Sequence, residues 1–235
     1  MKNLLLLLLL MGIAPQAIFA QEDANAATLT LDAFEQKLKQ SPAPQILDVR
    51  SPQEFAENHL EGAVNFYAPD EATFTKAVTS LDKKKPVFVY SINNGRSTTV
   101  SKKLREAGFP EVYPLPGGLA HWIGAGKPIV TTAGKGLTRE AYNQLVASNN
   151  VVLVDVGSKH CSGCKKLEPI VDEVGKEQTS LKVVKIELYD NRELAKNLDI
   201  QSVPTLILYK DGKPVWQKSG SITKNDIQAA LNSAL

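Results

Sequence analysis

The chain has 235 residues, of which 43% are hydrophobic and 22% charged, and its formal net charge is +2. This length allows one large domain or two small ones, and the apolar content is high enough to build cores, which excludes a wholly disordered chain. A net charge so close to zero gives no electrostatic reason to expect a nucleic acid or an anionic membrane surface as a partner.

Residues 1–20 have the pattern of a secretory signal peptide. Lys2 supplies the positive charge, residues 4–10 are all leucine, and Ala20 offers a small residue for cleavage. The apolar stretch is shorter than the roughly 20 residues that a membrane span needs, although an uncleaved signal anchor stays open as an alternative. We therefore expect cleavage near Ala20, no stable membrane insertion of the mature protein, and a periplasmic location, because the short leucine-rich form is typical of bacteria.

Strand and helix patterns alternate over residues 28–130. We expect helices at 31–38, from Ser51 onward, at 96–107 and around Trp122, and strands at 45–49, 86–90 and 112–113. Ser51, Pro52 and Glu54 have the spacing of a capping box with proline in the first turn, which marks the start of the second helix. This alternation predicts an α/β domain with a parallel sheet covered on both faces.

The small residues 131–136 are predicted to form a flexible linker, and a second α/β alternation follows over residues 137–235. We expect helices at 137–147, 164–174, 193–198 and 223–231, and strands at 151–156, 181–188, 205–209 and 215–218. Asp211 and Gly212 lie between the last two strands and predict a hairpin turn.

The only two cysteines, Cys161 and Cys164, follow a predicted strand and open a predicted helix. A sulfur at a helix N-terminus faces unpaired amide groups and the positive end of the helix dipole, which stabilise its thiolate, and Lys159 and His160 act in the same sense. Spacing of three lets Cys164 displace a substrate held on Cys161. We expect dithiol–disulfide exchange with no cofactor beyond this redox-active disulfide and no metal; an inert structural disulfide and half of a zinc site stay open as alternatives.

Further residues at fixed distances from the cysteines make residues 137–235 resemble the thioredoxin family. The matching positions are Asp155, Pro169, Lys185, Val203-Pro204-Thr205, Asp211-Gly212 and Gly220. The resemblance implies a thioredoxin-like α/β domain with a mixed sheet. His160, Gly157 and the Ser-Gly dipeptide between the cysteines depart from the family pattern, which leaves the reduction potential and the choice of partner open.

The thioredoxin resemblance also implies roles for individual residues. Asp155 is expected to move a proton to or from Cys164 and to pair with Lys185. Pro204 is expected to pack beside the sulfurs, and substrate contacts are expected from three further residues. These are His160, Val203 and Thr205.

Residues 28–130 resemble the rhodanese family. The resemblance rests on Leu47-Asp48-Val49-Arg50, on 59–65, and on Gly117-Gly118 with Trp122. It implies a loop whose first residue is the cysteine nucleophile in the sulfurtransferases, and this chain has Ser91 at that position. A serine hydroxyl is barely ionised at neutral pH and cannot hold a stable persulfide, so we expect a catalytically inactive domain without sulfurtransferase activity.

The loop around Ser91 can still form an anion pocket, because backbone amides at the start of a helix bind anions. The candidate lining residues are Ser91, Asn93, Asn94, Gly95 and Arg96. A scaffold that only docks partners is the alternative. Asp48, Arg50 and Glu54 are interpreted as structural, forming a buried ion pair and a helix cap, and Trp122 is interpreted as a core residue.

The expected function is that of a periplasmic thiol–disulfide oxidoreductase. A reductase is favoured because Asp155 and Lys185 are of the type found in the reducing members of the family. The expected partners are protein thiol or disulfide clients, a membrane thiol reductant and a small sulfur oxyanion bound by the first domain. Two alternatives stay open: sulfur or persulfide trafficking, and a rhodanese-like module that recruits a partner protein to a redox domain.

Overall fold

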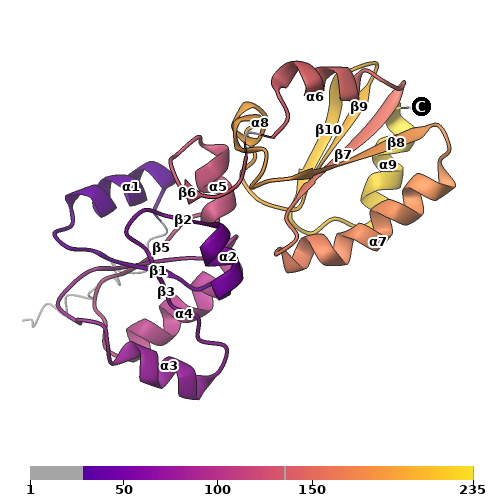
Figure 1. The fold of residues 1–235 in the computed structure, drawn as a ribbon. Coiled ribbons are helices and arrows are strands. Elements are labelled where there is room, and N and C mark those ends of the chain that lie inside the picture. The colour runs from indigo at the N-terminus through magenta and orange to yellow at the C-terminus, as the bar shows by residue number, and fades with distance from the viewer. Residues whose placement is uncertain (1–28, 135, 235) are drawn as a thin grey trace, which may run out of the picture.

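Two α/β lobes follow one another along the chain, as Figure 1 shows for this computed structural model. The structure describes residues 29–134 and 136–234, so the expected signal peptide lies outside the described residues. Within these ranges no helix is long and apolar enough to cross a membrane.

The first lobe contains a four-stranded, all-parallel sheet in the order β3-β1-β4-β5. Its strands are β1 (Gln45–Asp48), β3 (Val64–Asn65), β4 (Val87–Tyr90) and β5 (Val112–Pro114). Its helices are α1 (Leu31–Gln40), α2 (Pro52–Glu57), α3 (Glu71–Val78), α4 (Asn94–Glu106) and α5 (Gly118–Gly124). The predicted parallel sheet is therefore confirmed.

Helices cover both faces of this sheet. Side chains alternate between the two faces along each strand, so each strand contributes to both layers of packing. Val87 and Val89 pack with residues of α3 and α4, including Phe74. Phe88 and Tyr90 point the other way and pack with residues of α1 and α5. The helix start predicted at Ser51 is also confirmed, since the Ser51 side chain and the Glu54 side chain make both bonds of the capping box.

The second lobe contains a mixed four-stranded sheet in the order β10-β9-β7-β8. Strand β7 (Val151–Gly157) is parallel to β8 (Leu181–Glu187) and antiparallel to β9 (Thr205–Lys210), which forms a hairpin with β10 (Lys213–Ser219). The helices are α6 (Arg139–Val146), α7 (Ser162–Glu177), α8 (Arg192–Asn197) and α9 (Lys224–Ala234). The predicted hairpin turn is present, with Asp211 and Gly212 both at positive φ.

The described residues of the expected flexible linker 131–136 contact both lobes. Its first residue lies in strand β6 (Val130–Thr131), which pairs antiparallel with β2 (Asn58–His59) of the first lobe. The Thr132 N–H donates to the carbonyl of Glu57 at 3.0 Å. At the other end, Gly136 has φ +66° and lies against Asp190 and Asn191 of the second lobe, with no room for a Cβ.

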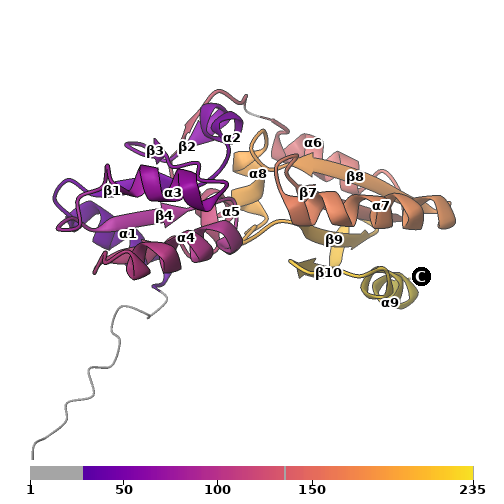
Figure 2. The same cartoon turned by 90° about the horizontal axis from the view of Figure 1, so that it is seen from below.

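One cluster of buried apolar side chains runs through both lobes. It joins Trp122 and Ile123 of α5 to Leu188, Tyr189 and Ile200 of the second lobe. Helices α5 and α8 lie side by side at this boundary in both Figure 1 and Figure 2. Gly124 lies so close to the backbone of Ile200 that a Cβ would overlap it. Because the interface is apolar and closely packed, it holds the two lobes in one arrangement.

Candidate active site

Cys161 and Cys164 lie where α7 begins, directly after the loop that leaves β7. Cys161 is the N-cap of α7, and its Sγ accepts a hydrogen bond from the Cys164 N–H at 3.1 Å. The two residues form a disulfide with their Cα atoms 5.2 Å apart. A sulfur at this position receives an amide donor and the positive end of the helix dipole, so its anionic form is stabilised once the disulfide is reduced.

The loop before β9 packs against the first of these sulfurs. The Val203–Pro204 peptide bond is cis, and the carbonyl oxygen of Val203 lies 3.6 Å from the Sγ of Cys161. Thr205, expected to contact the substrate, is instead fully buried. Its hydroxyl donates to the carbonyl of Ser202 at 2.7 Å and bonds the Ser219 hydroxyl, so Thr205 positions the loop.

Asp155 lies in β7 on the Cys164 side of the disulfide and is only 8% exposed. Burial raises the pKa of its carboxyl to about 6, against the lowering effect of the Lys185 charge. Its Oδ1 has no hydrogen-bond partner within the part of the chain that the structure describes. Asp155, Gly157, Cys164 and Lys185 line one cavity of about 400 Å³, which gives the carboxylate and the Cys164 sulfur a shared space through which a proton can pass.

Lys185 does not make the ion pair with Asp155 that the resemblance implies. Its ammonium group lies 2.9 Å from Glu168 and 2.8 Å from Asp172, both on helix α7. It acts on Asp155 only through its charge. Lys185 pairs with these two half-exposed carboxylates of α7 in place of the buried Asp155.

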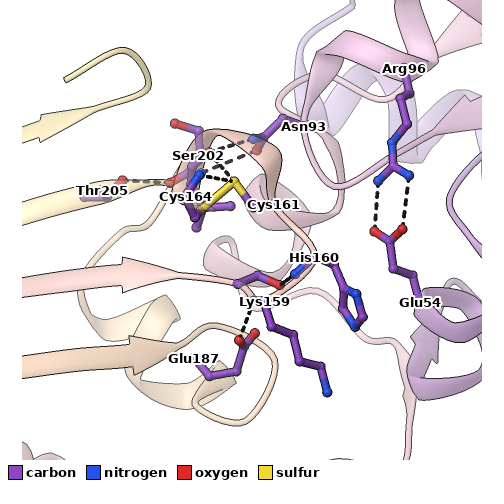
Figure 3. The surroundings of a disulfide bond; sticks show 12 residues. Glu54, Asn93, Arg96, Lys159, His160, Cys161, Cys164, Glu187, Ser202 and Thr205 are labelled. Carbon is purple, nitrogen blue, oxygen red and sulfur yellow. Dashed lines mark hydrogen bonds and ion pairs between the residues drawn. A yellow bond between two sulfur atoms is a disulfide. The ribbon is translucent and has the colours of Figure 1, made fainter. Parts of the chain in front are cut away.

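The side chains of the predicted anion pocket are largely engaged with the protein itself. Ser91 is buried, and its hydroxyl donates to the carbonyl of Asn93. Asn94 accepts a hydrogen bond from the Gly117 N–H at 2.8 Å. Arg96 makes a bidentate ion pair with Glu54 at 3.0 and 2.9 Å, so its charge is compensated (Figure 3). Gly95 has open space where a Cβ would stand.

The loop of the first lobe and the disulfide of the second face each other across one cavity of about 630 Å³. Figure 3 shows Asn93 beside the disulfide. Its side-chain amide donates to the carbonyl of Val203 at 2.6 Å, and its carbonyl oxygen accepts from the Val203 N–H at 3.4 Å. The cationic or protonatable side chains that line the cavity are Arg96, His160 and Lys166, and no carboxylate of the described residues lines it.

His160, which precedes the first cysteine, faces the other lobe. Its Nε2 lies 3.1 Å from a carboxylate oxygen of Glu57, and the Lys159 ammonium lies 2.8 Å from the second oxygen. Glu57 and Asn93 therefore both reach the redox loop from the first lobe. Sequence analysis placed Asn93 in an anion pocket and did not select Glu57, because contacts between residues more than 100 positions apart leave no local pattern.

A disulfide at the start of a helix, a cis-proline beside it and a buried carboxyl group behind it define a dithiol–disulfide exchange domain. The chain belongs to the thioredoxin family through residues 134–233, and a Rhodanese-like domain precedes them at residues 30–125. Both family resemblances found in the sequence are thereby confirmed. The structure adds that the rhodanese-like domain covers the redox site.

Individual thioredoxins match the second domain over most of their own length. The thioredoxin of Pyropia yezoensis is 38% identical over 98 residues, covering 41% of this chain and 92% of the relative. A thioredoxin of Mycobacterium tuberculosis is 43% identical over 92 residues, covering 39% of this chain and 79% of the relative. A solved mutant thioredoxin from Halobacterium salinarum is 30% identical and covers 44% of this chain and 95% of its own, with a TM-score of 0.39.

Proposed function

We propose that the protein is an exported reductase of disulfides, with Cys161 as the attacking thiolate and Cys164 as the resolving thiol. The observation that supports this most directly is the hydrogen bond from the Cys164 N–H to the Cys161 sulfur at the start of α7. That bond stabilises a thiolate on the sulfur that lines the cavity between the domains.

The reaction proceeds in two exchanges. The Cys161 thiolate attacks one sulfur of a substrate disulfide, forming a mixed disulfide and releasing the first substrate thiolate. Cys164 then attacks the Cys161 sulfur, which forms the Cys161–Cys164 disulfide and releases the second substrate thiolate. Two electrons pass from the enzyme dithiol to the substrate, and an external dithiol reduces the enzyme again.

The second exchange needs a proton acceptor, because the resolving cysteine attacks as a thiolate. Asp155 lines the same cavity as Cys164 and has a pKa of about 6, so it is ionised at neutral pH and accepts this proton. Burial raises the pKa of Asp155, which makes its carboxylate a stronger base for taking the Cys164 proton.

The signal-peptide pattern of residues 1–20 supports export to the periplasm. In an oxidising compartment a reductase needs a source of electrons, so we propose a membrane thiol reductant as the partner that regenerates the dithiol. The thioredoxin family acts on protein thiols and disulfides, and the rhodanese-like domain forms one wall of the space that a substrate must enter.

The proposal is tested with mature full-length protein and dithiothreitol as the electron source. We expect reduction of small disulfides above the uncatalysed rate, and no activity in Cys161→Ser. Cys164→Ala should accumulate a mixed disulfide on Cys161, visible as added mass. Failure of the native protein to turn over any disulfide, together with no adduct on Cys164→Ala, would overturn the proposal.

A further inference from the structure

Two backbone groups stand free of the sheet next to the reactive sulfur. Val203 precedes the first residue of β9 by two positions, so neither its N–H nor its C=O belongs to the strand ladder. Its carbonyl oxygen lies 3.6 Å from Cys161 Sγ. An adjacent donor and acceptor are what an extended peptide uses to pair with a backbone, so a polypeptide carried on Cys161 would bond here.

Asn93 of the rhodanese-like domain already occupies both groups. Its carboxamide donates at 2.6 Å to the Val203 carbonyl and accepts at 3.4 Å from the Val203 N–H. A side-chain carboxamide offers the same donor and acceptor as a peptide unit. With Asn93 in this position, Cys161 is only 2% exposed.

The position of Asn93 is fixed from both sides. Asn93 is the N-cap of α4, yet its side chain makes no capping bond and instead bonds Val203 of the other domain. Gly118, at φ +67°, packs against its backbone, with the Asn93 N and Cα each 2.7 Å from where a Cβ of Gly118 would stand. The apolar cluster that crosses the boundary keeps the second domain in place. Asn93 therefore competes with any peptide as a preorganised group.

We propose that Asn93 is a specificity-determining residue that withholds the Val203 backbone from extended polypeptides and reserves Cys161 for low-molecular-mass disulfides. Such molecules reach the sulfur through the cavity of about 630 Å³ between the domains. Arg96 and His160 line this cavity but pair with Glu54 and Glu57, whereas Lys166 has no ion-pair partner among the described residues. The charge of Lys166 favours substrates that carry carboxylate groups. This inference rests on the proposed disulfide exchange and names the substrate class of the same site.

The test compares two substrates in single turnovers of pre-reduced, full-length protein. Insulin serves as the polypeptide disulfide and dithiobis-nitrobenzoate as the small dicarboxylate disulfide. Samples are quenched with acid, and the remaining enzyme thiols are counted by alkylation. We expect Asn93→Ala to raise the rate constant with insulin about tenfold over the native value, because two hydrogen-bonding groups become free. The rate constant with the small disulfide should stay within about twofold of the native value.

Asn94→Ala is the matched control, because the Asn94 side chain bonds Gly117 within its own domain. It should leave the ratio of the two rate constants unchanged. Asn93→Asp is the second variant: a carboxylate cannot donate to the Val203 carbonyl, so the ratio should again shift toward insulin. Thermal unfolding checks that each variant is folded.

The two disulfides differ in intrinsic reactivity, because the aromatic thiolate of dithiobis-nitrobenzoate is the better leaving group, so each rate constant is divided by that of dithiothreitol with the same substrate. After this correction the native protein should react with insulin at least about tenfold more slowly than with the small disulfide. Equal corrected rate constants for the two substrates, or an unchanged ratio in folded Asn93→Ala, would overturn the role of Asn93 while leaving the oxidoreductase intact. No reaction with either substrate would instead overturn the proposed function.

Discussion

Arg50 of the rhodanese-like domain donates a hydrogen bond at 3.0 Å to the hydroxyl of Tyr189 in the thioredoxin domain. Arg50 is fully buried, and it also bonds Asp48 and Asn58. The predicted buried ion pair of Asp48 and Arg50 is therefore present, and it extends to the second domain. Because a buried guanidinium is costly to leave unpaired, this contact ties the two domains together.

We predict that Tyr189→Phe lowers the free energy of unfolding by about 1–3 kcal/mol, since one donor of a buried charged group loses its partner. The ring still fills its place, so the change isolates the hydroxyl. Urea unfolding followed by circular dichroism measures the effect. Tyr113→Phe is the control, because the Tyr113 hydroxyl bonds Glu111 and Lys37 within the first domain, at an exposed position. Equal stability of the two variants would contradict the bridging role of Tyr189.

Glu57 makes another polar link between the domains, to Lys159 and His160. The Lys159 hydrogen bond holds the pKa of the Glu57 carboxyl below its ordinary value of 4.5, against a smaller effect of burial, and His160 adds to the lowering. Because the pKa of Glu57 is lower in the folded protein than in the unfolded chain, its carboxylate contributes stability at pH values above the unfolded pKa. That contribution is lost as the pH falls through the pKa of the folded protein.

Glu57→Gln should therefore be less stable than the native protein near neutral pH, by less than about 1 kcal/mol because the contact is partly exposed. The difference should shrink below the ordinary pKa of 4.5 and vanish once Glu57 is protonated. Urea titrations along a pH series measure it. Glu61→Gln controls for net charge, because Glu61 lies in the same region and makes no ion pair with any residue that the structure describes. A pH-independent difference for Glu57→Gln would contradict the account.

Local patterns in the sequence predicted local structure well. The capping box at Ser51, the hairpin at Asp211-Gly212 and the start of α7 at the cysteine pair each depend on residues within a few positions of one another. Helix α3 was not predicted, although Asp70 caps it through a bond to the Thr73 N–H. Its short length and few apolar residues leave a weak periodic signal.

Partner choice at long range could not be predicted from the same sequence. Lys185 has carboxylates within reach on two elements, and it pairs with Glu168 and Asp172 of helix α7 and not with Asp155 of β7. Asn93 and Val203 are 110 positions apart, and only the packing of two domains brings them together. Sequence motifs locate each loop, whereas the interface decides what each loop binds.

Neighbouring lysines on α7 face different cavities, which allows a matched test of the charge in the substrate space. Lys166 lines the cavity between the domains, and Lys165 lines the one that contains Asp155. We predict that Lys166→Gln slows the reaction with dithiobis-nitrobenzoate about two- to fivefold at low salt, because a partly exposed charge contributes up to about 1 kcal/mol. Added salt should reduce the difference.

Lys165→Gln should leave this rate unchanged, and a neutral disulfide such as hydroxyethyl disulfide should react equally with both variants. Thiosulfate, as a small sulfur oxyanion, should slow the native protein more than Lys166→Gln if the same cavity binds it. Identical rates for Lys165→Gln and Lys166→Gln with the dicarboxylate would contradict an anion-attracting cavity.

Asp155 offers the sharpest pH test, because burial raises its pKa to about 6 from an ordinary value of 3.8. In the native protein, release of the second thiol should accelerate as the pH rises through about 6 and Asp155 becomes able to accept the Cys164 proton. Asp155→Asn should lose this inflection and slow the step by roughly a hundredfold at neutral pH. Single turnovers with separate quantification of the two released thiols measure the step.

The same substitution should make the protein more stable. Because the pKa of Asp155 is higher in the folded protein than in the unfolded chain, its protonated carboxyl group contributes stability below about pH 3.8. This contribution is lost as the pH rises through about 6. Asp155→Asn escapes this loss, so near neutral pH it should exceed the native protein by about 2–3 kcal/mol, and the difference should vanish in acid. Asp172→Asn alters a Lys185 partner on the surface and removes one charge that raises the pKa of Asp155, so it should keep the inflection, moved to lower pH, and should not reproduce the gain in stability. If Asp155→Asn is slower but no more stable, then burial does not destabilise the ionised carboxyl group. A raised pKa would then not be the reason that Asp155 takes part in proton transfer.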